Sequence, residues 1–62
     1  REVYEAVRNL PDPGRTVVIL HYYEDLTLKQ IAEITDVNLN TVKYRLYSSL
    51  ERLKKRLKEE AL

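Results

Sequence analysis

The stretch of sequence that decides the fold is Leu26–Leu46, LTLKQIAEITDVNLNTVKYRL. Its apolar residues recur at helical spacing on both sides of the short segment 35–37, which carries an aspartate. The pattern predicts two short helices joined by a tight turn. The second helix is expected to begin with polar residues and to continue into a basic segment. This arrangement is typical of a helix-turn-helix.

The first of these helices has two signals at its start. Thr27 and Gln30 have the spacing of a capping box, and Leu26 and Ile31 have the spacing of a hydrophobic staple. A helix that begins here places its apolar residues on one side. We expect that side to be buried, with three residues: Ile31, Ala32 and Ile34.

The turn and the start of the second helix also have local sequence signals. Asp36 can adopt the left-handed conformation that a glycine would adopt at lower cost. Asn38 is expected to cap the second helix, where Val37 and Val42 repeat the staple spacing. One narrow apolar stripe then runs along this helix: Val42, Leu46, Leu50, Leu53 and Leu57. A leucine stripe with flanking charges is also compatible with a short coiled-coil seam.

The N-terminal part predicts two further helices. Within residues 1–10 the apolar side chains at helical spacing are Val3, Val7 and Leu10. Asp12 is expected to cap the next helix and Pro13 to take its first position. Segment 17–23 is rich in β-branched and aromatic residues that favour strands, but it has no partner strand, so we expect a helix. Its inward side would contain Val17 and Leu20, with Val18 and Tyr22 as further candidates. The expected fold is all-α, a compact four-helix domain containing a helix-turn-helix.

Composition and charge limit the classes of function. The chain has 62 residues, so we expect one small domain spanning 1–62, and it has no cysteine, which fits the cytoplasm. No membrane span or signal peptide is visible, and the start at Arg1 suggests a fragment of a longer protein. Residues 1–37 hold four basic and seven acidic side chains, whereas residues 38–62 hold seven basic and three acidic ones. The second half could therefore neutralise DNA phosphates, although a solvated helix end would look similar.

A helix in the major groove reads bases with its N-terminal turns. Here those turns direct four side chains outward: Asn40, Thr41, Tyr44 and Ser48. Cations on the flanks are expected to contact phosphates: Lys43, Arg45 and Arg52. Tyr47 could contact DNA or pack across the bundle, and Lys29 could meet the backbone from the preceding helix. Arg15 could do likewise, or pair with Glu24 or Asp25.

Catalysis finds little support in the sequence. His21 is the sole histidine and lies in an apolar and aromatic segment, where a structural role is expected. The chain has no Ser-His-Asp arrangement, glycine-rich phosphate loop or metal-ligand spacing. We therefore expect neither enzymatic activity nor a cofactor.

Several stretches carry a family resemblance: Leu10-Pro11 with Arg15 and Val18, Leu26-Thr27, Ile31-Ala32-Glu33, Thr41-Val42-Lys43, Arg45-Leu46 and the basic tail 50–57. In these the chain resembles region 4 of bacterial sigma factors, particularly the extracytoplasmic-function group. The resemblance implies a domain that binds the promoter minus-35 element and the flap of the RNA polymerase β subunit, and that anti-sigma factors often occlude. It also implies which residues contact DNA: Thr41, Lys43, Tyr44, Arg45, Tyr47 and Ser48.

The chain departs from the family pattern at three positions. Asp36 stands where the turn usually has glycine, and Asn40 replaces a common glycine and could add a contact. Ser48 stands where arginine is frequent, which puts a guanine contact in doubt. Two alternatives remain open. A LuxR-type response-regulator domain shares the Ile-Ala and Thr-Val-Lys pattern, and a protein-interaction module could use the leucine stripe.

Overall fold

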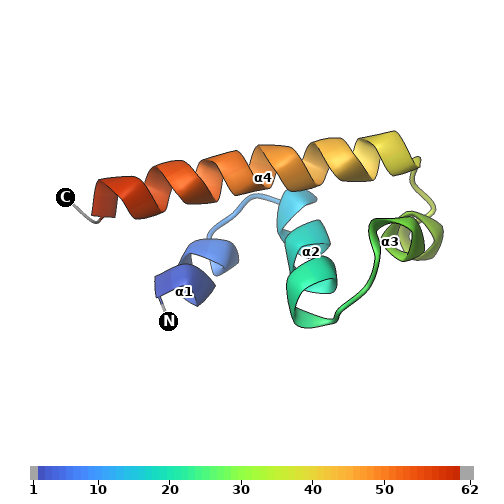
Figure 1. The fold of residues 1–62 in the computed structure, drawn as a ribbon, viewed down its shortest axis with the longest axis horizontal. Helices are drawn as coiled ribbons and strands as arrows, with labels where there is room; N and C mark the ends of the chain where they lie inside the picture. Colours follow the sequence, from blue (N-terminus) through green and yellow to red (C-terminus); the bar gives the residue numbers. More distant parts are fainter. Residues whose placement is uncertain (1, 61–62) are drawn as a thin grey trace.

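The computed structural model describes residues 2–60, and one long helix organises them. The helices are α1 (Glu2–Arg8), α2 (Gly14–Val18), a π-helical continuation η1 (Ile19–Tyr23), α3 (Leu28–Thr35) and α4 (Leu39–Glu60). The three shorter α-helices lie along one side of α4, with α1 toward its C-terminal end and α3 beside its N-terminal end (Figure 1). No strand occurs among residues 2–60. The expected all-α fold with four helices is confirmed.

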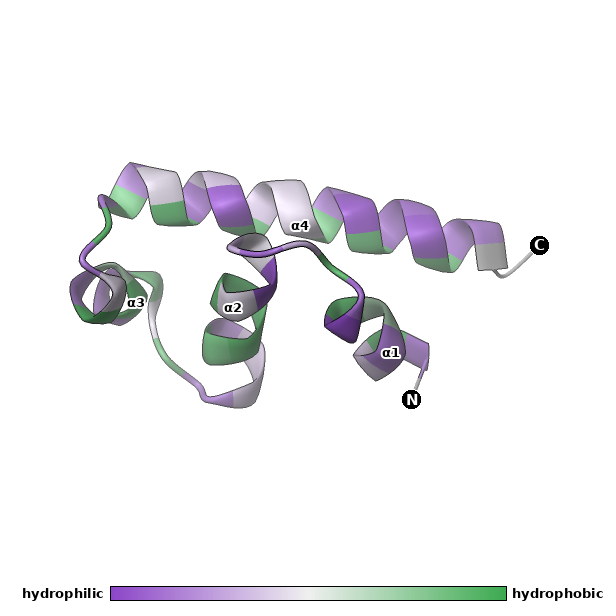
Figure 2. Cartoon of the chain, turned by 180° about the vertical axis from the view of Figure 1, so that it is seen from behind, coloured by the Kyte–Doolittle hydropathy of each residue, from purple (hydrophilic) through white to green (hydrophobic). Residues whose placement is uncertain are grey.

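The core lies between α4 and the shorter helices. Its buried members are Ala6, Val7, Leu10, Val17, Val18, Ile31, Val42, Leu46 and Leu53. Along α4 the hydrophobic colouring follows the side toward the shorter helices, and the opposite side is hydrophilic (Figure 2). The predicted stripe is therefore confirmed, with Leu50 and Leu57 partly buried at its edge. Because burial of each such side chain contributes roughly 1.5–3 kcal/mol, the stripe stabilises this domain itself.

Hydrogen bonds at the helix-turn-helix confirm the predicted caps. The Gln30 N–H donates to Thr27 Oγ1 at 3.0 Å, and the Thr27 N–H donates to Gln30 Oε1 at 2.8 Å. Asp36 has φ 57° and ψ 44°, and the next N–H, that of Val37, donates to the Ala32 carbonyl at 3.0 Å. This is the bond of a Schellman motif. Asn38 then begins the turn into α4, so the angle between α3 and α4 is set by local bonds.

One residue expected on a buried side, Ile34, is exposed, and so are Tyr22, a candidate for the inward side, and Val3, an apolar residue at helical spacing. Ile34 is 63% exposed because α3 packs on α4 and η1 through Leu28 and Ile31, and none of the described elements covers Ile34. Val3 is 50% exposed, and Ala6 of the same helix is buried in the core. Tyr22, which is 53% exposed, lies in η1, where the Glu24 N–H bonds to the Ile19 carbonyl five residues back. That wider turn rotates the residues that follow it away from the α-helical register.

The start of α2 differs from the prediction by one residue. Pro13, not Asp12, is the N-cap, and the helix begins at Gly14. The Asp12 carboxylate nevertheless accepts bonds from the Thr16 hydroxyl at 2.7 Å and from the Thr16 N–H at 3.1 Å. Arg15 pairs with Asp12 at 2.5 Å rather than with Glu24 or Asp25.

These contacts also affect the protonation of Asp12. The Thr16 hydroxyl lowers the pKa of the Asp12 carboxyl group most, and the Thr16 N–H and Arg15 act in the same direction. A lowered pKa means that folding favours the carboxylate. The stabilisation is therefore present at neutral pH and is lost as the pH falls through the folded-state pKa.

A close approach of α2 to α4 was not expected from the sequence. Gly14 is buried, and a Cβ atom there would collide with Ser49 Oγ. The same atom would lie 3.5 Å from Ser49 Cβ and 3.4 Å from the Arg45 carbonyl oxygen, which are tolerable contacts. Ser49 is 4% exposed and is the one buried polar side chain among the described residues. A glycine and a small residue together allow α2 to meet α4 end-on.

We expect Gly14→Ala to destabilise the domain by about 1–3 kcal/mol, because the added methyl overpacks the contact with Ser49. Urea unfolding followed by circular dichroism measures the change. Adding Ser49→Ala removes the colliding oxygen and should restore much of the loss, whereas adding Ser48→Ala should not. Equal unfolding free energies for the two double variants would contradict this account of the contact.

Candidate DNA-binding surface

The candidate surface is formed by α4, and its size follows from the length and position of this helix. This helix has 22 residues, and at 1.5 Å per residue it is about 33 Å long. Its side away from α1, α2 and α3 is hydrophilic and is covered by no other element of residues 2–60 (Figures 1 and 2). The N-terminal turns of α4 therefore offer their outer side chains to a large binding partner.

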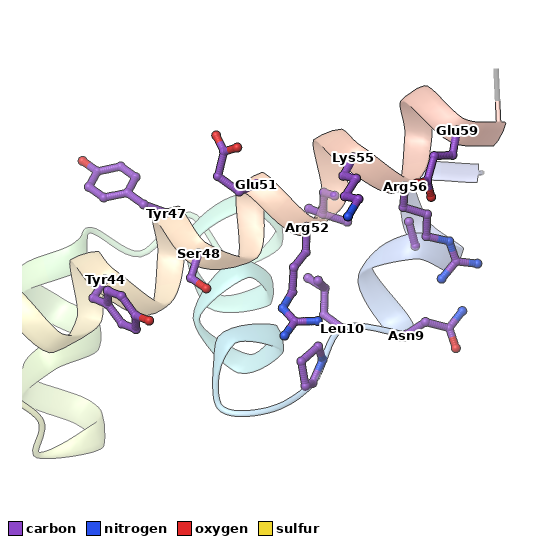
Figure 3. A pocket seen from close by; sticks show the side chains of 13 residues that line it. Asn9, Leu10, Tyr44, Tyr47, Ser48, Glu51, Arg52, Lys55, Arg56 and Glu59 are labelled. Atoms are coloured by element: carbon purple, nitrogen blue, oxygen red, sulfur yellow. The ribbon is translucent and has the colours of Figure 1, made fainter. Parts of the chain in front are cut away.

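Three of the expected contact residues are well exposed on α4. Asn40 is exposed in the first turn, Tyr44 is 73% exposed one turn later, and Tyr47 is 58% exposed. These values exclude packing of Tyr47 across the bundle, which the sequence left open. In Figure 3, Tyr47 points away from α4 on the side opposite to Leu10, whereas Tyr44 is directed toward the other side of the helix. The two rings thus extend from different sides of α4.

Three other expected contact residues are half-buried: Thr41, Arg45 and Ser48. Arg45 and Ser48 line a small cavity of about 160 Å³ against Pro13 and Gly14 at the start of α2. The close approach at Gly14 brings α2 onto this flank of α4 and covers part of both side chains. This flank is consequently less accessible than the outer side of the helix.

The expected phosphate-contacting cations have no partner among the described residues. Lys43 and Arg52 are exposed on α4, and Lys29 is exposed in the first turn of α3. No ion pair or hydrogen bond engages these side chains or Arg45 among the described residues. The structure therefore places Lys29 on a separate helix beside the end of α4, and the other cations on α4 itself.

A groove next to this surface was not expected from the sequence. It has a volume of about 870 Å³ and is lined by α4 from Tyr44 to Glu59, by α1 and by the loop after α1. Figure 3 shows Ser48 and Arg52 directed toward the side of this loop, with Arg56 and Asn9 farther along. Four expected contact residues line the groove: Tyr44, Tyr47, Ser48 and Arg52. No pattern in the sequence indicated a groove, because its two walls come from segments far apart in the chain.

The sole histidine makes a structural contact, as expected from the sequence. His21 Nδ1 lies 2.8 Å from the Leu26 carbonyl oxygen, so the ring fastens the end of η1 to the chain before α3. Within residues 2–60, no group of three His, Cys, Asp or Glu side chains is placed to hold a metal ion. None of the helices there is both long enough and apolar enough to cross a membrane.

Comparison with known proteins agrees with this geometry. Residues 1–53 match the family model of sigma-70, region 4. The chain is 46% identical over 61 residues to the RNA polymerase sigma factor SigV of Bacillus subtilis (strain 168), a match that covers 98% of this chain and 37% of that protein. It is 37% identical over 57 residues to the ECF RNA polymerase sigma factor SigW of the same organism, which covers 92% of this chain and 30% of that protein.

A third relative comes from another organism. The ECF RNA polymerase sigma-E factor of Haemophilus influenzae is 32% identical over 57 residues, which covers 92% of this chain and 30% of that protein. The chain thus spans about a third of the length of the curated relatives it matches. The family match extends through α1 and α2 as well as the helix-turn-helix, which disfavours the LuxR-type alternative. The chain belongs to the sigma-70 region 4 family and is similar to members of its extracytoplasmic-function group.

Proposed function

We propose that this chain binds the promoter minus-35 element as the C-terminal domain of a longer, cytoplasmic sigma factor that directs RNA polymerase to promoters. One observation carries the proposal. The N-terminal half of α4 has its apolar side buried against the other helices and its polar, unpaired side exposed. A helix with these two sides fits a major groove, which is about 12 Å wide.

In this proposal α4 is the recognition helix. Asn40 and Tyr44 face the base edges, and Lys43 and Arg52 contact phosphates on the flanks of the groove. Arg45 and Ser48 contact DNA at the side of α4 that α2 partly covers, and Thr41 and Tyr47 complete the surface. Lys29 reaches a phosphate from α3, where that helix crosses the groove edge. No enzymatic activity and no cofactor are part of the proposal.

A second surface supports a contact with the polymerase. Tyr4, Tyr22 and Tyr23 are each about half exposed, and the rings of Tyr4 and Tyr23 meet edge-on with centroids 6.1 Å apart. They belong to α1 and η1, and η1 lies at the end of α2 away from α4 (Figure 1). Exposed tyrosines are typical of the centres of protein interfaces. We assign this patch to the β-subunit flap, so that DNA and polymerase can be bound together.

An anti-sigma factor would act on the DNA side in this arrangement. A protein that covers Asn40 and Tyr44 excludes the duplex without displacing any buried residue of α4. The interaction-module alternative is weaker because the leucine stripe that it needs is occupied by the core.

The salt dependence of binding tests the proposal. With about four phosphates contacted, the affinity of the chain for duplex DNA should fall with a log–log slope of about −3.6 in salt concentration. Lys43→Ala should flatten this slope by about one unit on any sequence. Lys58→Ala, far along α4, is the matched control and should change the slope less. Fluorescence anisotropy across a salt series measures each slope, and a slope near zero for the unaltered chain would contradict DNA binding.

Tyr44→Ala should weaken binding to the cognate promoter element by about 1–3 kcal/mol if the ring touches a base. The loss on unrelated DNA should be smaller, because no base is read there. Competition titrations with both duplexes measure the two losses. Equal losses would reassign Tyr44 to the DNA backbone.

Tyr23→Ala should lower the affinity for the isolated β-flap by at least 1 kcal/mol, because aromatic residues at interface centres contribute most of the binding energy. Its affinity for promoter DNA should stay unchanged. Tyr44→Ala provides the reciprocal control, with weakened DNA binding and unchanged flap binding. Calorimetric titration measures both partners, and a Tyr23 variant with full flap affinity would exclude the patch as the polymerase site.

A further inference from the structure

The carboxamide side chains of the chain point to the base that α4 reads. A carboxamide can bond adenine through two bonds at once, because its oxygen accepts from the N6 amino group and its nitrogen donates to N7. Such a bond requires that both ends of the carboxamide are available. The chain contains four carboxamides, all within the described residues: Asn9, Gln30, Asn38 and Asn40.

Three of these side chains are already engaged within the chain. Asn9 Nδ2 donates to the Glu5 carbonyl at 2.9 Å. Gln30 Oε1 accepts from the Thr27 N–H in the capping box at 2.8 Å. Asn38 Oδ1 accepts from the Asn40 N–H at 2.7 Å and so caps α4. Each of the three would have to give up its bond before it could pair with a base.

Asn40 differs from the other three. Its side chain is exposed and makes no hydrogen bond to any described residue, so its oxygen and nitrogen are both available. It is the second residue of α4, in the turn that enters deepest when a helix approaches the groove by its N-terminus. Tyr44 follows four residues later, on the same outer side of the helix.

The arginines, which would read guanine in the same manner, are placed less well. Arg45 is half-buried against α2 and lies about 140° around the helix from Asn40. Arg52 is exposed but lies about 18 Å farther along the axis. Lys43 is exposed in the same turns, but its ammonium group is a single point charge without a planar edge. In the first two turns, the outer side of α4 therefore offers one planar side chain for two-bond base recognition, and it is a carboxamide.

We propose that Asn40 determines specificity by reading one adenine in the major groove, with Oδ1 accepting from N6 and Nδ2 donating to N7. The inference rests on the proposed DNA binding, and it adds which base is read and which atoms form the two hydrogen bonds. Asn38 assists as a positioning residue, because its bond to the Asn40 N–H fixes the backbone from which the reading side chain extends.

Selection from randomised duplexes at low salt tests the inference. The unaltered chain should enrich a motif with one A·T pair preferred about 5- to 150-fold over other pairs, which corresponds to 1–3 kcal/mol. Asn40→Ala should lose the preference at that pair alone. Asn9→Ala removes a carboxamide outside the outer side of α4 and should leave the motif unchanged. An unaltered motif with Asn40→Ala contradicts the inference but not DNA binding, whereas no motif for the unaltered chain contradicts both.

A change on the DNA side gives a test in which protein folding is not altered. Replacing the preferred adenine by 7-deazaadenine removes the N7 acceptor and keeps the base pair. The unaltered chain should lose affinity severalfold for this duplex, and the Asn40→Ala chain should bind both duplexes equally. Equal affinity of the unaltered chain for the two duplexes would overturn the assignment of N7 as the partner of Asn40.

Discussion

The structure depends on burial along one side of α4. Val42, Leu46 and Leu53 are each less than a tenth exposed, and α4 contacts all three shorter helices. Since a helix has only one such side to bury in a chain of this size, the opposite side must be polar and must remain in solvent. The exposed surface that we assign to DNA is thus the geometric complement of the core. The same helix therefore supplies the buried side chains of the core and the exposed polar side chains of the surface.

Local bonds then orient that surface. The left-handed Asp36 and the bond from the Val37 N–H to the Ala32 carbonyl end α3, and two residues later Asn38 caps α4. Since none of these bonds joins residues far apart in the chain, the direction in which α4 begins is determined by a segment of a few residues. The buried Val42, at 0% exposure, then holds the first turn of α4 against the core. Pairing of local caps with one buried anchor gives a rigid start to the helix that we assign to DNA.

Much of this could be predicted from the sequence because the signals are local. The capping box at Thr27, the turn at Asp36 and the cap at Asn38 each involve residues within five positions, and all three are confirmed. The stripe on α4 was equally predictable, since its period extends over several turns. Tyr44 and Asn40 follow from that stripe, being on the opposite side of a regular helix.

Other features depend on contacts between segments far apart in the chain. The approach of Gly14 to Ser49 joins residues 35 positions apart, and no periodicity in the sequence encodes it. It partly covers Arg45 and Ser48, which the sequence placed in the open. Ile34 was assigned inward because it is apolar, but α3 packs on α4 and η1 in an orientation that leaves Ile34 in solvent. The bond from Glu24 to Ile19 that widens η1 is equally invisible in a pattern of apolar residues.

That widened turn has an evolutionary consequence. A π-helical turn accommodates one residue more than an α-helical turn, so deletion of a single residue between Ile19 and Tyr23 would return the segment to α-helical register. Such a deletion would rotate the aromatic side chains of η1 relative to α1, whereas the caps and the turn that join α3 to α4 lie outside the deleted segment. Descendants of one ancestral domain could in this way exchange protein partners while they keep the helix that we propose to recognise DNA.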